Sequence, residues 1–477
     1  MNLRRSDFVP FFEPQGVAVV GSLREPRGEA LTVLRNMQRF GFTGQVYPIN
    51  PSQSEVLGLK VYSKLKDVTE PVDLAMLITP PNAVAGLLEQ CAGKGTRAVI
   101  VGTEGFAERG EVGGSLQRQL VEVARGRGLR LLGPNTVGLV NTSNGLVTVP
   151  YMIGYKTIKK GGIAYASQSG FVGAQGQPLE DRAYPISKMC DFGNKCDINE
   201  ADLLDYLVHD VETKVIVLHL ESVSEGRRFV HALTEAVASK PVLIFKTGRT
   251  LDGARASSSH TGSLASTSRV FDVLFKQTGA IRLDTWQEYW EVPKIFALQA
   301  LPKGNRLGVV TATGGVGVAV VDVAVEHGLS IAPLSDRSLS KLTSLGIHVN
   351  RNPVDLGPAM VVNEDPLRLT EEAIRVVLAD SNVDLVHVVL PGGVERWATA
   401  TVKMFEGLKS DMAKPLSVYV YGTRVSIIEA VARQLDSVDV PAYLDMDTSV
   451  KALAAMARYA EILSWTEPIR AQAGIQK

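Results

Sequence analysis

The sequence predicts an α/β fold of three consecutive domains, each built on a sheet of parallel strands. Short apolar runs, each followed by a glycine-containing turn and an amphipathic stretch, recur along the 477 residues, which is the pattern of parallel strands connected by helices. The pattern restarts near residues 163 and 306. Hydrophobic residues make up 45% of the chain and charged residues 21%, which is typical of globular proteins.

The first domain begins with the clearest strand and helix. Residues 16–21 (GVAVVG) are expected to form a buried strand, residues 22–28 a loop, and residues 29–40 a helix that ends at Gly41. Further strands are expected at 45–50, 73–79, 97–102 and 129–132. Five strands make one nucleotide-binding-type domain, which we place at residues 1–150.

The second and third domains follow a polar segment rich in Tyr, Gly and Lys at 151–162, which is expected to be a linker. We place the second domain at 151–300, with strands at 163–166, 214–220 and 241–246 and a Ser/Gly-rich loop at 247–263. We place the third domain at 301–477, with strands at 307–311, 384–390 and 416–420 and a final helix at about 448–463.

Composition and charge limit the classes of partner. The 50 basic and 50 acidic side chains cancel, which removes a global electrostatic reason for binding nucleic acid or an anionic membrane. The three cysteines form no CxxC pair, which fits a reducing compartment and indicates no metal site. The sequence shows no signal-peptide pattern and no apolar run of roughly 20 residues, so we expect a cytoplasmic protein.

The most specific local pattern is a histidine in a stretch rich in glycine and hydroxyl groups. Residues 246–265 read KTGRTLDGARASSSHTGSLA, which places His260 beside Ser259, Thr261 and Gly262. A neutral imidazole is a nucleophile toward phosphorus, and neighbouring hydroxyls and amides can hold the transferred phosphoryl oxygens. The other six histidines lie in helical or strand patterns, where we expect packed or surface side chains.

This stretch closely resembles the phosphohistidine loop of ADP-forming acetyl-CoA synthetases, which are relatives of succinyl-CoA synthetase. The family signature contains Ser-His-Thr-Gly, then a small residue and Leu-Ala. The chain also carries the family's other landmarks in the family's order: 20–22 (VGS), 47–51 (YPINP), 133–135 (GPN), 167–170 (SQSG), 193–195 (GNK), 200–204 (EADLL) and 352–356 (NPVDL). The resemblance therefore spans almost the whole chain.

The resemblance implies a Rossmann-like CoA-binding domain, a ligase domain that bears the histidine, and a further domain, the last two being flavodoxin-like as in succinyl-CoA synthetase. It also implies an activity. The family joins a carboxylic acid, CoA and ATP into acyl-CoA, ADP and phosphate, reversibly, through an acyl phosphate and a phosphohistidine, here His260.

The resemblance also implies roles for individual residues. CoA would lie over strand ends of the first domain, where open α/β sheets bind ligands. Glu221 matches the glutamate that steadies the active histidine, and a carboxylate that accepts the Nδ1 hydrogen would leave Nε2 as the nucleophile. The implied CoA contacts are Gly21, Ser22, Asn50, Pro51, Thr79 and Pro80. The implied acyl and phosphate contacts are Asn135, Ser169, Gly170, Gly193, Asn194, Ser259, Thr261 and Gly262.

Judged by the residues alone, Glu221 is equally an ordinary strand-end carboxylate, and the glycine loops are tight turns. Two departures from the family pattern also matter. Thr136-Val137 stands where the family commonly has Cys-Leu, near the expected acyl site, so the resemblance does not imply acetate as the substrate. The glycine turn at 311–317 (TATGGVG) also differs from the family's, which leaves the role of the third domain open.

No ATP-grasp nucleotide site is visible after residue 300, where a glycine turn occurs without a glycine-rich hairpin, paired lysines or a carboxylate cluster for magnesium. We therefore expect a separate ATP-grasp β subunit, which would hold ATP or ADP and Mg²⁺, in an α2β2-like assembly. Two other functions remain open. One is a non-catalytic, CoA-responsive regulatory subunit, and the other is an NAD-dependent enzyme, which the irregular first glycine loop disfavours.

Overall fold

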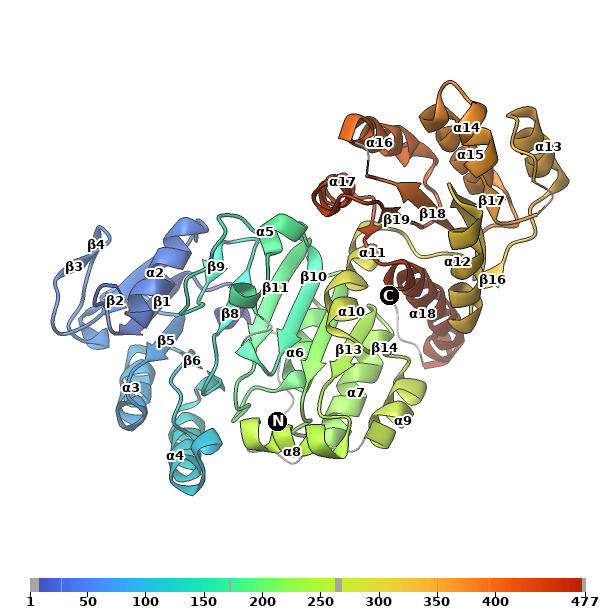
Figure 1. The fold of residues 1–477 in the computed structure, drawn as a ribbon. Helices are drawn as coiled ribbons and strands as arrows, with labels where there is room; N and C mark the ends of the chain where they lie inside the picture. The colour runs from blue at the N-terminus through green and yellow to red at the C-terminus, as the bar shows by residue number, and fades with distance from the viewer. Residues whose placement is uncertain are drawn as a thin grey trace. The chain divides into compact units, whose positions relative to one another are not determined.

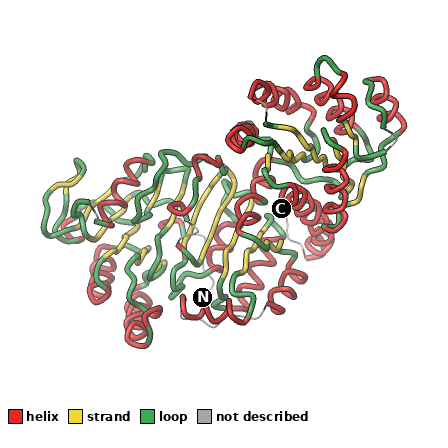
Figure 2. The backbone as a smooth tube through the Cα atoms, viewed as in Figure 1, coloured by secondary structure: helices red, strands yellow, loops and turns green. Residues whose placement is uncertain are grey.

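The computed structural model of the chain describes residues 8–26, 28–170, 173–261, 268–349, 351–393 and 395–473. The chain divides into two compact units, one of Met1–Glu180 with Tyr184–Asp284 and one of Asp181–Ala183 with Thr285–Lys477. The predicted α/β fold is confirmed, with two large sheets in the first unit and one in the second (Figure 1). Helices alternate with the strands along the chain (Figure 2).

The first sheet is entirely parallel and has the order β2-β1-β5-β6-β7. All five predicted strands are present: β1 (Gly16–Gly21), β2 (Gln45–Ile49), β5 (Leu74–Ile78), β6 (Ala98–Val101) and β7 (Arg130–Leu132). The connecting helices are α2 (Glu29–Arg39), α3 (Pro81–Lys94) and α4 (Glu111–Arg127). The chain crosses from one half of the sheet to the other between β1 and β5, so the loops after these two strands diverge and leave a crevice.

The second sheet repeats this order in its parallel part. Its full order is β14-β13-β12-β10-β11-β8-β9, in which β8 and β9 form an antiparallel edge. Its strands are β8 (Leu139–Asn141), β9 (Leu146–Val147), β10 (Lys160–Ser167), β11 (Ile186–Asp191), β12 (Val215–Leu220), β13 (Val242–Lys246) and β14 (Ile281–Leu283). The crossing point lies between β10 and β12. The crevice of this sheet therefore opens after Ser167 and Leu220.

Strand β11 is not predicted from the sequence, because three of its six residues are polar. Its burial is nevertheless complete. Lys188, for example, is 2% exposed, and its Nζ lies 2.8 Å from Asp210 Oδ2. A distant carboxylate thus satisfies a charge that makes the local sequence look unlike a strand.

The predicted loop at 247–263 is wrong over most of its length, because helix α8 (Leu251–Thr261) occupies it. Serine and glycine favour helices weakly, so composition indicates a loop here. The start of the helix is stabilised by Thr250, whose Oγ1 accepts a hydrogen bond from the amide of Gly253 at 3.0 Å. The other helices of the first unit after α4 include α6 (Glu200–Val208), α7 (Gly226–Val237) and α9 (Ser268–Thr278), and the short α1 (Val9–Phe12) lies near its start.

The second unit contains a parallel sheet of order β16-β15-β18-β19-β20, with β17 also paired to β15. Its strands are β15 (Arg306–Thr311), β16 (Ser330–Ile331), β17 (Val354–Asp355), β18 (Leu385–Pro391), β19 (Leu416–Tyr421) and β20 (Ala442–Tyr443). Its helices are α10 (Trp286–Glu291), α11 (Pro293–Leu298), α12 (Gly314–Glu326), α13 (Asp336–Ser344), α14 (Gly357–Val362), α15 (Pro366–Ala379), α16 (Glu395–Leu408), α17 (Val425–Ser437) and α18 (Met446–Ala473). Within the described ranges, no helix combines the length and the apolar character needed to cross a membrane.

A buried lysine joins three elements of the second unit. Lys294 on α11 is 3% exposed, and its Nζ lies 2.8 Å from Glu291 Oε2 and 3.1 Å from Asp436 Oδ2 of α17. The same Nζ donates a hydrogen bond to the carbonyl oxygen of Ala442 on β20. Removing the ammonium group would leave two carboxylates with little access to water and without their cation.

We predict that Lys294→Met lowers the free energy of unfolding of the second unit by about 3 to 5 kcal/mol, because a buried carboxylate loses its partner. All four tryptophans lie in this unit, so denaturant unfolding followed by tryptophan fluorescence measures its stability. The matched control is Lys341→Met at an exposed position of α13, for which we expect a change within about 0.5 kcal/mol. Equal losses in the two variants would contradict the prediction.

Candidate functional site

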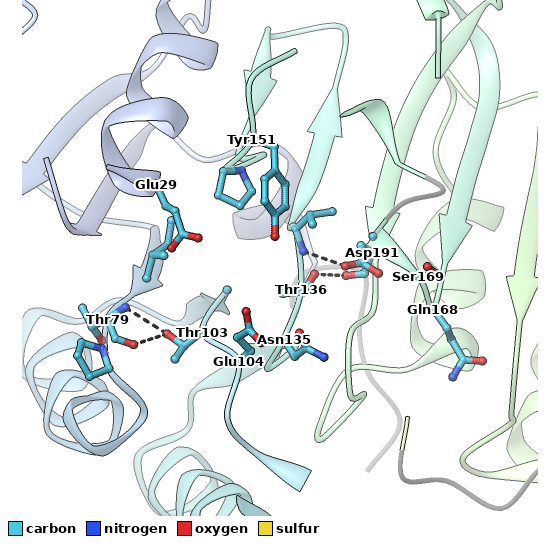
Figure 3. Close-up of a pocket in the computed structure, with 16 residues that line it drawn as sticks. Glu29, Thr79, Thr103, Glu104, Asn135, Thr136, Tyr151, Gln168, Ser169 and Asp191 are labelled. Atoms are coloured by element: carbon cyan, nitrogen blue, oxygen red, sulfur yellow. Dashed lines mark hydrogen bonds between the residues drawn. The ribbon is translucent and has the colours of Figure 1, made fainter. Parts of the chain in front are cut away.

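A cavity of about 650 Å³ lies in the first unit, where loops at the carboxyl ends of strands from both large sheets come together (Figure 3). In Figure 3, Thr79 and Thr103 lie at one end of the cavity and Ser169 and Asp191 at the other. The lining residues are Glu29, Ile78, Thr79, Pro80, Gly102, Thr103, Glu104, Asn135, Thr136, Val137, Pro150, Tyr151, Gln168, Ser169, Gly170 and Asp191. Five residues predicted from the sequence are among them: Thr79, Pro80, Asn135, Ser169 and Gly170.

The six residues predicted to contact CoA gather at one edge of the first sheet. Gly21 pairs with Ile78 across β1 and β5, and Asn50 Nδ2 donates a hydrogen bond of 2.8 Å to the Gly21 carbonyl oxygen. A Cβ on Gly21 would lie 2.5 Å from the Ile78 carbonyl oxygen, so the close approach of these strand ends requires glycine. Thr79 and Pro80 line the cavity, whereas the remaining four, Gly21, Ser22, Asn50 and Pro51, lie beside it without lining it.

The predicted phosphate-binding loops at 133–135 and 193–195, from the first and second domains, pack against each other. Gly193 has a φ of +56°, and a Cβ there would lie 2.3 Å from the carbonyl oxygen of Pro134. The Asn194 amide donates to that same oxygen at 2.9 Å, and Asn135 Nδ2 lies 3.4 Å from Asn194 Oδ1. Gly193 and Asn194 therefore lie behind Asn135 and hold it at the cavity.

Asp191 lines the cavity but is not among the residues selected from the sequence, because the strand that it ends, β11, is not predicted. The residue is 4% exposed, and its Oδ2 accepts a hydrogen bond of 2.8 Å from the amide of Val137. Burial raises the pKa of Asp191 to about 6, which the amides of Val137 and Gly193 oppose and the charge of Glu221 reinforces. Its position two residues before the landmark 193–195 is the one signal in the sequence that could have identified it.

Gln168 connects the cavity to Glu221. Its Oε1 accepts hydrogen bonds from the amides of Glu221 and Ser222 at 2.5 and 2.8 Å, and its Nε2 donates to Ser222 Oγ at 3.1 Å. Lys246 Nζ donates to the Glu221 carbonyl oxygen at 2.8 Å. Hydrogen bonds therefore fix both the amide and the carbonyl group of Glu221, which is 7% exposed.

Two buried lysines act electrostatically on the Glu221 carboxylate. Burial lowers the pKa of Lys246 to about 8, and the negative charge of Glu221 opposes this shift. Burial also lowers the pKa of Lys195, whose Nζ lies 2.9 Å from Glu200 Oε2, and the charges of Glu200 and Glu221 oppose it. Two buried lysines therefore lie close enough to Glu221 to interact with it electrostatically.

A hydrogen-bonded histidine lies beneath the same strand ends. His219 Nδ1 lies 2.9 Å from Ser167 Oγ, and its Nε2 lies 3.0 Å from Thr247 Oγ1. The side chain is 2% exposed, so His219 joins the ends of β10, β12 and β13 as a packed residue. Both ring nitrogens of His219 are directed at these hydroxyl groups and not at a substrate.

His260 belongs to the last turn of α8, but its side chain and those of Ser259 and Thr261 lie outside the described residues, as does Gly262. The backbone of α8 packs close to the short helix η3 (Ala107–Arg109). Glu108 of η3 accepts a hydrogen bond from Asn194 Nδ2. The helix that carries His260 therefore runs next to the loops that hold Asn135.

Among the described residues, no group of three or more His, Cys, Asp and Glu side chains is arranged to bind a metal ion. The carboxylates of the cavity lie on separate elements: Glu29 on α2, Glu104 after β6 and Asp191 at the end of β11. The chemistry that this arrangement supports is the binding of a ligand between strand-end loops rather than metal catalysis by a preformed cluster.

Two protein-family models match the first unit and the start of the second. A model described as a CoA binding domain matches residues 15–142, and one described as a succinyl-CoA ligase like flavodoxin domain matches residues 160–296. Their order along the chain is the order of the first two sheets. The two models together cover all the described lining residues of the cavity except Pro150 and Tyr151.

Curated relatives and solved structures agree with these matches. The α subunit of acetate–CoA ligase [ADP-forming] II of Pyrococcus furiosus is 36% identical over 380 residues, 79% of this chain and 80% of the relative. The α subunit of enzyme I of the same organism is 32% identical over 94% of this chain and 97% of its own length. A structure of a dinucleotide forming acetyl-coenzyme A synthetase 1 of Ca. Korarchaeum cryptofilum with phosphate and ADP has a TM-score of 0.88 at 29% identity and covers 97% of this chain and 98% of its own.

The identities extend over nearly the full length of both the chain and the α subunits, and the fold agrees over the same length. The resemblance inferred from the motifs is therefore confirmed. The chain belongs to the family of ADP-forming acyl-CoA synthetases and corresponds to their α subunit.

Proposed function

We propose that this chain, as an ADP-forming acyl-CoA synthetase, passes the phosphoryl group between ATP and a carboxylic acid on His260. The observation that carries the proposal is the cavity, which brings Thr79, Pro80 and Asn135 of the CoA-binding domain to the same space as Ser169 and Gly170 of the histidine-bearing domain. Acyl transfer to a thiol requires such a meeting of two substrates.

The steps balance as follows. His260 Nε2 attacks the terminal phosphorus of ATP, the bond to the bridging oxygen breaks, and ADP leaves. A carboxylate oxygen of the acid then takes the phosphoryl group from Nε2, which gives an acyl phosphate and restores the imidazole. The sulfur of CoA attacks the carbonyl carbon, the bond to the phosphate oxygen breaks, and the thiol proton is released to water. Each step is reversible, so the same residues serve the formation of ATP.

Glu221 is proposed to orient His260. A carboxylate that accepts the Nδ1 hydrogen fixes the tautomer and stabilises the positive charge that develops on the ring. The support is the fixed position of Glu221, whose backbone is held by Gln168 and Lys246, and its electrostatic interaction with Lys195 and Lys246. A rigid, ionised carboxylate is what this role requires.

CoA is proposed to bind along the edge formed by the ends of β1, β2 and β5. This edge is the crossing point of the first sheet, where ligands bind in open α/β sheets. The proposed contacts are Gly21, Ser22, Asn50, Pro51, Thr79 and Pro80. Thr79 is held in place by Thr103, whose Oγ1 donates to the Thr79 carbonyl oxygen at 2.7 Å.

The acyl phosphate is proposed to bind at Asn135, Ser169 and Gly170, with Gly193 and Asn194 holding Asn135 in position and Ser259, Thr261 and Gly262 joining from the histidine segment. Ser169 and Gly170 follow β10 at the crossing point of the second sheet, where amides point toward a bound anion. The Ser169 amide donates to Ser167 Oγ at 2.9 Å, which fixes the turn and leaves the Ser169 side chain to contact the phosphate.

A separate ATP-grasp β subunit is proposed to hold the nucleotide and Mg²⁺, in an assembly such as α2β2 in the cytoplasm. Three features support it: the relatives named above are α subunits, the described cysteines are unpaired thiols, and the described residues contain no metal cluster. The boundaries at residues 150 and 300 remain predictions of how the roles divide along the chain.

We predict that His260→Asn abolishes the nucleotide-dependent formation of acyl-CoA by the chain co-expressed with an ATP-grasp subunit, since no other ring replaces its Nε2. Incubation with acyl-CoA and ³²P-labelled phosphate should label the wild type with an acid-labile phosphate and leave the variant unlabelled. The matched control is His231→Asn, an exposed histidine on α7, which should keep full labelling. Labelled or active His260→Asn would contradict the proposal.

We also predict that Gln168→Ala speeds hydrogen exchange at the amides of Glu221 and Ser222, because each loses a buried acceptor at a cost of about 1 to 3 kcal/mol. Misplacement of Glu221 should lower kcat by roughly 10- to 100-fold. Gln168→Glu keeps an acceptor oxygen at the same place and should retain slow exchange. Unchanged exchange and kcat in Gln168→Ala would show that Gln168 does not position Glu221.

A further inference from the structure

The cavity presents an electrostatic problem for the substrates that it is proposed to bind. Among the described residues that line it, three are carboxylic acids, Glu29, Glu104 and Asp191, and none is lysine, arginine or histidine. A carboxylate substrate and an acyl phosphate are both anions. Two anions brought together away from water repel each other strongly unless one of them takes a proton.

Asp191 is the buried member of the three. It is 4% exposed, whereas Glu104 pairs with Arg109 at the surface and Glu29 begins α2 at an exposed position. A carboxyl group shielded from water is the one whose charge costs most. The protonation state of this side chain therefore matters most to a bound anion.

The two oxygens of Asp191 have different surroundings. Oδ2 accepts the Val137 amide at 2.8 Å, whereas the described partner of Oδ1 is the Gly193 amide at 3.4 Å, which is long for a hydrogen bond. Oδ1 is therefore the oxygen that can carry a proton. Gly170 of the phosphate loop lies next to the carboxyl group on the Oδ2 side, because a Cβ there would lie 3.4 Å from Oδ2.

Among the described residues, the charge that acts most on Asp191 is acidic, whereas a hydrogen bond from the Thr136 side chain and the amides of Val137 and Gly193 lower its pKa. Glu221 at the end of β12 reinforces the effect of burial on its pKa, which lies at about 6. Across the cavity, burial and the charges of Glu29, Glu104 and Asp191 raise the pKa of the Tyr151 hydroxyl. Asp191 consequently holds a proton more readily than an ordinary aspartate, and an anion placed beside it would bind that proton more tightly still.

We propose that Asp191 binds the phosphate group of the substrate as a neutral acid, donating a hydrogen bond from its carboxyl group to a phosphate oxygen, and that phosphate binding at neutral pH takes up one proton from water at this position. The inference rests on the proposed function, because it takes the cavity as the site of the acyl phosphate. A protonated aspartate that serves as a hydrogen-bond donor in an apolar site has precedent in enzyme chemistry.

The direction of the pH dependence follows from the free protein. Below pH 6 Asp191 already carries its proton, so phosphate binds with full affinity. Above pH 6 the proton must be taken from water, so the affinity falls by about tenfold for each pH unit. Asp191→Asn supplies an amide donor at every pH, with its oxygen still able to accept the Val137 amide.

The experiment measures the dissociation constant of inorganic phosphate for the full chain by calorimetry at pH 5.5 to 8. The ionisation of phosphate itself affects both proteins equally and cancels in the ratio of wild type to Asp191→Asn. We expect a ratio near one at pH 5.5 that rises by about tenfold per unit above pH 6.5. Glu104→Gln, which removes a carboxyl group from the same cavity, should show the wild-type pH dependence.

A ratio that stays constant with pH, or wild-type protein that binds no phosphate at pH 5.5, would overturn the inference. Proton uptake by the wild type gives a second readout that needs no variant: calorimetry at pH 8 in buffers of different ionisation enthalpy should show close to one proton taken up, and none would overturn it. Phosphate binding requires no turnover. If the ratio of dissociation constants stays constant while ³²P still labels His260, only the inference about Asp191 is wrong. If the ratio changes with pH as expected but His260 is not labelled, only the phosphohistidine proposal is wrong.

Discussion

The hydrogen bonds from the amides of Glu221 and Ser222 to the Gln168 side chain hold the proposed site together. Strands β10 and β12 are neighbours at the crossing point of the second sheet, so the chain leaves them in opposite directions and the backbone ladder ends. A side chain must then connect the two ends. The side chain of Gln168 makes this connection, and its backbone continues into the loop that lines the cavity. The position of the loop relative to Glu221 is therefore fixed.

The same strand order occurs in the parallel parts of the first two sheets, and each crossing point supplies half of the cavity. Thr79 follows β5 in the first sheet, and Ser169 follows β10 in the second. The repetition explains how one unit can present two different substrates to each other. Each sheet is proposed to bind a ligand at its own crevice, and the cavity is where the two crevices meet.

Charge is distributed unevenly between the cavity and the ends of β12 and β13. The buried lysines of this region, Lys195 and Lys246, act on Glu221, whereas the cavity itself is lined by acids. In the proposed function, this arrangement supports the carboxylate that would orient the histidine, and amides, hydroxyls and a protonated Asp191 would bind the anions. Neutral donors bind a phosphate group less tightly than a cation would. Weaker binding suits an intermediate that must react in the next step.

Sequence alone determined the α/β class, the strands that begin each sheet and the residues of the family motifs, because apolar runs followed by glycine turns are local patterns. Tertiary structure decided what depends on distant partners. Strand β11 forms because Asp210 neutralises Lys188, α8 forms in a segment of weak helix propensity, and Asp191 enters the cavity only because β11 ends there. A charge that another element satisfies cannot be recognised from its own neighbours in the sequence.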